Sequence, residues 1–117
     1  MSVSRKFPSS GLDLKDVVGS DTKLELFLNS KQLDPDLLTV PKLGDGTLRD
    51  LLNVNINNTN QLVGKFASMD FEYAKCVEWM KSNVAYNQSQ LIVVAVLYKL
   101  DMMGFVIPPV KGDWRKL

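Results

Sequence analysis

Residues 91–103 have the sequence LIVVAVLYKLDMM, in which only two side chains are charged. Valine and isoleucine also favour strands, but this run is longer than a typical strand, so we expect a helix. It would begin near Asn87 or Ser89 and stop at Gly104, since glycine commonly ends helices. A helix that is apolar all round must be covered on nearly every side. We therefore predict a central, buried helix.

The clearest apolar periodicity lies just before this stretch. Six apolar side chains are separated by alternating steps of four and three, which places them on one stripe of a helix: Leu62, Phe66, Met69, Tyr73, Cys76 and Met80. This spacing predicts a helix over about 59–82. Gly64 weakens it, and residues 68–70 could cap a fresh start, so two helices meeting near Ser68 are the alternative.

Shorter helices are indicated upstream by capping signals. A threonine and a glutamate with the spacing of a capping box predict a helix over about 22–30. Asp34 before Pro35 indicates a second start, which opens a short turn. Together with the two longer segments, these signals define the fold class that we predict: mainly α, a small single-domain helical bundle with a buried C-terminal helix.

A glycine-rich loop, residues 44–46, precedes another expected helix. Thr47 and Asp50 resemble a capped start for residues 48–52, and the alternating residues 53–57 are left as irregular or extended. Free amides at such a helix start can hold an anion. The loop lacks the lysine and the spacing of a P-loop, so a simple turn and cap is the preferred interpretation.

Length and composition are those of one folded domain. The chain has 117 residues, of which 45% are hydrophobic and 23% charged, with a net charge of +1. We divide it into a flexible arm (1–10), a helical domain (11–107) and a basic tail (108–117). The basic excess lies at the two ends, so the field of the folded core should be weak, which argues mildly against a nucleic-acid surface.

The side chains of familiar catalytic and zinc sites are missing from the sequence. There is no histidine and the single cysteine is Cys76, which excludes an intramolecular disulfide and the usual zinc ligand sets. Cys76 falls on the apolar stripe and is expected to be a small buried hydrophobe. The pair Asp34 and Asp36 is better explained by helix caps than by catalysis. We predict no enzymatic activity, no metal and no cofactor.

Targeting signals are likewise not recognised. Arg5 and Lys6 lead into Phe7 and Pro8 rather than into an apolar run. The longest apolar run, residues 91–98, is far shorter than the roughly 20 residues that span a bilayer. We expect a protein that stays in the cytoplasm or within a virion, neither secreted nor embedded in a membrane.

The carboxyl end carries the functional hypothesis. The segment 91–110 holds more apolar residues than one helix in so small a chain can readily hide, and exposed apolar patches usually mark an interface. An aromatic anchor with a basic rim would complete it. We expect a non-catalytic interaction or assembly module that contacts a protein partner or associates with itself. The expected contact residues are Phe105, Ile107, Val110, Trp114, Lys111, Arg115 and Lys116.

A winged-helix, nucleic-acid-binding protein is the alternative. The order of residues 89–106, followed by prolines and a basic segment, resembles a recognition helix running into a wing. However, a face that meets base edges and phosphates needs polar and basic groups, whereas this helix offers Val94, Ala95 and Tyr98. Nucleic acid is therefore the second choice of partner.

Overall fold

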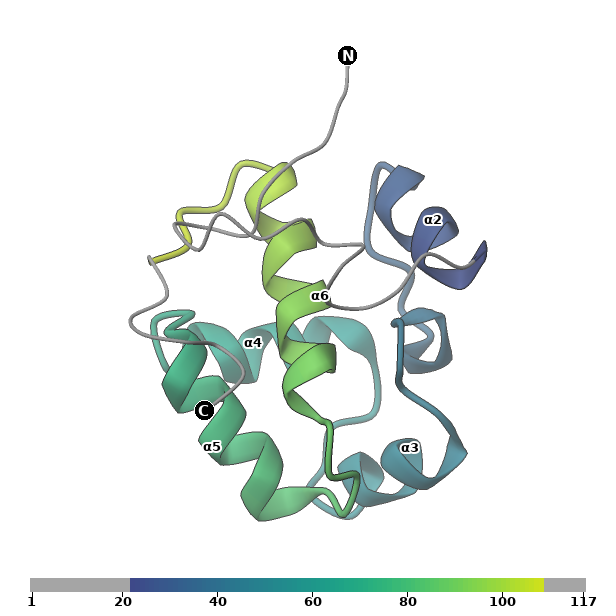
Figure 1. The fold of residues 1–117 in the computed structure, drawn as a ribbon, viewed down its shortest axis with the longest axis vertical. Helices are drawn as coiled ribbons and strands as arrows, with labels where there is room; N and C mark the ends of the chain where they lie inside the picture. The colour runs from purple at the N-terminus through teal and green to yellow at the C-terminus, as the bar shows by residue number, and fades with distance from the viewer. Residues whose placement is uncertain (1–21, 109–117) are drawn as a thin grey trace.

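Helix α6, Gln90–Met102, runs through the middle of the molecule (Figure 1). All ten residues from Leu91 to Leu100 are buried, so every face of the helix is covered. Gly104 follows the helix with φ +98°, a conformation that glycine adopts without steric cost. The predicted central helix and its stop are confirmed.

The computed structural model describes residues 22–108. The elements that surround α6 are α2 (Thr22–Asn29), the 3₁₀ turn η1 (Leu37–Thr39), α3 (Asp45–Leu52), α4 (Thr59–Ala67) and α5 (Tyr73–Asn83). Within residues 22–108 there is no strand. The protein is thus mainly α, a small helical bundle, as the sequence predicts; the arm 1–10 and nearly all of the tail lie outside the described residues.

The periodic segment 59–82 forms two helices, so the prediction of one continuous helix is wrong and the alternative is confirmed. After Ala67 the chain turns, and both Asp70 (φ 58°) and Phe71 (φ 56°) adopt left-handed conformations that a helix cannot contain. The amide of Phe71 donates to the carbonyl of Phe66 at 2.9 Å, which closes the end of α4. The turn keeps the stripe on one side, because Leu62, Phe66, Tyr73, Cys76 and Met80 are all buried.

Two capping assignments need correction. Helix α3 begins at Asp45, with Gly44 as its N-cap, and Thr47 lies inside the helix rather than capping it. The turn η1 is capped by Asp36, whose carboxylate accepts from the amide of Leu38 at 2.9 Å, while Asp34 accepts from the amide of Asp36. In both cases several short polar residues stand close together in the sequence, and only the backbone path selects the capping residue.

A buried lysine fastens α6 to α2. Lys99 is only 2% exposed, and its Nζ donates to the carbonyl oxygens of Leu28 (3.4 Å) and Ser30 and to Oγ of Ser30 (3.2 Å). These carbonyls lie at and just past the C-terminal end of α2, where a cation is favoured. The sequence-based expectation of a uniformly apolar helix missed this contact.

Candidate interaction surface

Large apolar side chains become exposed where α6 ends. Met102 is 44% exposed, Met103 39%, Phe105 42% and Val106 88%, whereas residues 91–100 are all buried. We call these four residues the C-terminal patch. Contiguous apolar patches larger than a few hundred Å² are rare on soluble monomers and usually mark an interface.

The patch is held in place by the backbone and by one aromatic contact. The amide of Phe105 donates to the carbonyl of Leu100 at 3.0 Å, and the amide of Gly104 to that of Asp101 at 3.1 Å. The ring of Phe105 meets the ring of Phe71 edge to face, with centroids 5.9 Å apart. The turn between α4 and α5 therefore supports the patch from one side.

The structure places only two of the residues predicted as contacts. Phe105 lies in the patch, whereas Ile107 is half-buried and packs against the core. Val110, Lys111, Trp114, Arg115 and Lys116 lie outside the described residues. The sequence analysis did not name Met102 and Met103 as contact residues, because they continue the apolar run that it assigned to the buried helix. The charged side chain of Asp101 was the only feature of the sequence that marks the end of the buried part of this helix.

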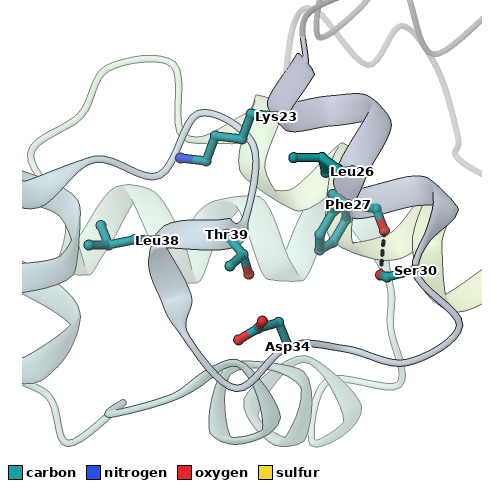
Figure 2. A pocket seen from close by; sticks show the side chains of 7 residues that line it. All are labelled: Lys23, Leu26, Phe27, Ser30, Asp34, Leu38 and Thr39. Carbon is teal, nitrogen blue, oxygen red and sulfur yellow. Dashed lines mark hydrogen bonds between the residues drawn. The ribbon is translucent and has the colours of Figure 1, made fainter.

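A second apolar surface lies between α2 and η1. A cavity of about 570 Å³ is lined by Leu26, Phe27 and Leu38 together with four polar residues, and Figure 2 shows Leu26 and Phe27 above Thr39 and Asp34. Leu26 is 69% exposed at this cavity.

The polar groups of this cavity are engaged with the protein's own backbone. Lys23 donates to the carbonyl of Leu43 at 3.1 Å, Ser30 to that of Phe27 at 3.0 Å, and Thr39 to that of Asp36 at 2.7 Å. Nucleophilic catalysis needs a nucleophile within hydrogen-bond reach of a base, and these pairings do not create such an arrangement. The cavity is suited to an apolar occupant.

Burial shifts the pKa values of two side chains, Cys76 and Lys99. Burial raises the pKa of the Cys76 thiol to about 12, with a smaller contribution from Glu72, so the reactive thiolate is disfavoured. Burial also lowers the pKa of Lys99. Within residues 22–108, no group of three acidic or cysteine side chains is placed to hold a metal ion.

Comparisons with known proteins identify no relative of this chain. No family model matches the chain, and neither a curated protein nor a solved structure matches it. Among the helices of residues 22–108, none has the length and apolar character needed to cross a membrane.

Proposed function

We propose that this protein is a non-catalytic interaction module that associates with a second copy of itself through the C-terminal patch. The observation that supports this is the exposure of Met102, Met103, Phe105 and Val106 shortly after the ten buried residues 91–100 of α6. Methionine and phenylalanine are enriched in the cores of protein interfaces, and methionine adapts to irregular surfaces.

The chemistry of the patch favours self-association over a charged partner. Residues 102–107 contain no charged side chain. An uncharged apolar surface is complementary to its own copy across a two-fold axis, whereas specific pairing with a different protein usually draws on complementary charges. Four side chains provide less than the roughly 800 Å² per partner of stable complexes, so we expect a Kd weaker than about 1 μM.

Sedimentation equilibrium across a range of protein concentrations tests the proposal. The mass of the wild-type protein should rise towards that of a dimer, and Val106→Asp should remain monomeric, because a buried unpaired carboxylate opposes association. Leu52→Asp is the matched control: Leu52 is 45% exposed at the end of α3, the opposite end of the molecule from the patch (Figure 1). A wild-type protein that stays monomeric, or a Val106→Asp variant that associates equally well, would refute the proposal.

Deleting residues 108–117 separates this proposal from the winged-helix alternative. Under our proposal the shortened protein stays folded, and any association that it loses depends only weakly on salt. A loss of binding to mixed DNA or RNA that is steeply salt-dependent in the full chain would instead favour the nucleic-acid function.

A further inference from the structure

Leu26 is the most exposed large apolar side chain of residues 22–108 outside the C-terminal patch. Helix α2 buries Leu24 and Phe27 in the core, as one face of an amphipathic helix should. Leu26 lies on the other face of α2, where a helix at the edge of a protein ordinarily carries a polar residue. The core therefore does not account for a leucine at this position.

This leucine borders the cavity of about 570 Å³ between α2 and η1. Phe27 and Leu38 line the same cavity, and Figure 2 shows Leu26 and Phe27 on α2 across from Thr39 on η1. The ammonium and hydroxyl groups that line the cavity donate to nearby carbonyls of the protein. The surface that is left for an occupant is therefore mainly apolar.

The chain supplies an apolar segment directly before α2. Residues 1–21 lie outside the described residues, and they end where α2 begins, at Thr22. Within them, residues 11–18 have the sequence GLDLKDVV. Three apolar side chains of this stretch have the i, i+3, i+4 spacing of one helical face: Leu14, Val17 and Val18. The charged residues of the stretch fall outside this face.

The connection is long enough to bring this segment back over α2. The four Cα–Cα steps from Val18 to Thr22 span at most about 14 Å. Leu26 lies about one helical turn beyond Thr22, roughly 6 Å along the axis. Val18 can therefore reach Leu26 if the chain reverses direction between them, and Gly19 and Ser20 are residue types that turns favour.

A tethered segment has an advantage over any separate molecule. A short linker gives its attached segment an effective concentration of about millimolar at a nearby site, so a few apolar contacts are enough to hold it there. Helix α2 would also gain from the contact. It has only eight residues, and helices this short depend on packing for their stability.

We infer that residues 11–18 dock in the cavity between α2 and η1, with Leu14, Val17 and Val18 packed against the apolar side chains that line it. The contact is made within one chain. It is separate from the C-terminal patch, so it does not depend on the proposed self-association. The same segment of a second copy is the competing occupant.

Paramagnetic relaxation enhancement in the full chain tests the inference. A nitroxide spin label is attached to Asp16→Cys, and Cys76 does not compete for the label because it is fully buried. The amide resonances of Leu38 and Thr39, on the η1 side of the cavity, should lose most of their intensity. Adding Leu14→Asp to the labelled chain should restore most of it, because a carboxylate opposes burial among apolar side chains.

Two controls identify the source of the effect. Lys15→Asp places a carboxylate in the same segment but off the apolar face, so the intensity loss at Leu38 and Thr39 should persist. In a mixture of spin-labelled chains with isotope-enriched, unlabelled chains, these two resonances should keep their intensity. Equal intensities with and without Leu14→Asp would overturn the inference, and so would a loss of intensity in the mixture, which would assign the cavity to a second copy.

A double-mutant cycle in urea unfolding provides a second measurement. Leu14→Ala and Leu26→Ala should each raise the equilibrium constant for unfolding. The double variant should fall short of the product of the two effects by about threefold or more, because both changes remove the same contact. Leu52→Ala, which alters another exposed leucine at the end of α3, should combine with Leu14→Ala multiplicatively. Multiplicative effects in both pairs would contradict the docking of residues 11–18.

Discussion

Cys76 should make the protein measurably less stable in alkaline solution. The side chain is fully buried, and its pKa is raised from 9.0 to about 12, chiefly by desolvation. In the unfolded chain the thiol ionises near its ordinary pKa, so above that pH the unfolded state has lost a proton that the native state keeps. Stability from this group is therefore complete below pH 9.0 and is lost as the pH rises towards about 12.

The size of the effect follows from the shift in pKa. Between about pH 8 and pH 11, the thiol should lower the free energy of unfolding by about 2–3 kcal/mol, a large part of the stability of a small domain. Cys76→Ala removes the titrating group, so this part of the decline should disappear. Other groups that titrate in this range are common to both proteins and cancel in the comparison.

Urea unfolding of the wild type and of Cys76→Ala, in reducing buffer across this pH range, measures the difference directly. The free energy lost by the wild type should exceed that lost by the variant, and the gap should widen steadily above pH 9.0. A difference between the two proteins that stays constant across the pH range would show that the thiol has the same pKa in the folded and unfolded states. The argument that burial raises the pKa of Cys76 would then fail.

The remaining predictions concern α6, one surface pair and metal ions. Because burial lowers the pKa of Lys99, the wild type should gain stability from this group as the pH rises towards 10.5, and Lys99→Met should lack that gain in the same urea experiments. Leu97→Asp should abolish the cooperative thermal transition, since it buries an unpaired carboxylate. Lys75→Ala, which removes an exposed ion pair with Glu72, should change stability by less than about 0.5 kcal/mol; equal effects from these two variants would contradict the assigned faces. Adding EDTA should leave the melting temperature unchanged, and a clear drop would reveal a carboxylate metal site.

The helices could be predicted from sequence where one physical signal dominated. The run 91–103 was too long for a typical strand and formed a helix whose residues 91–100 are buried, and helix α2 lies within the range 22–30 that the capping-box spacing predicted. The break between α4 and α5 could not be located in the same way. The apolar period continues across it, because the left-handed residues Asp70 and Phe71 rotate the chain without moving the stripe off the core.

The candidate surfaces were less predictable because they depend on contacts between distant segments. The sequence predicted that α6 is apolar all round and did not explain Lys99, because the carbonyls to which its ammonium donates belong to Leu28 and Ser30, about seventy residues earlier. Thr47 resembled a cap, yet it lies inside α3 and lines a hollow together with Tyr86, which belongs to the segment after α5. Local patterns do not specify which residue of a later segment will lie opposite.

The central position of α6 has a consequence for how the chain folds during synthesis. Residues 22–83, which form the elements around α6, leave the ribosome before it does. Until α6 emerges, the apolar side chains of these elements lack the helix against which they pack, so the native core cannot form. The nascent chain then exposes apolar surfaces that aggregate or recruit chaperones. Folding of the native core should therefore wait for the last described helix.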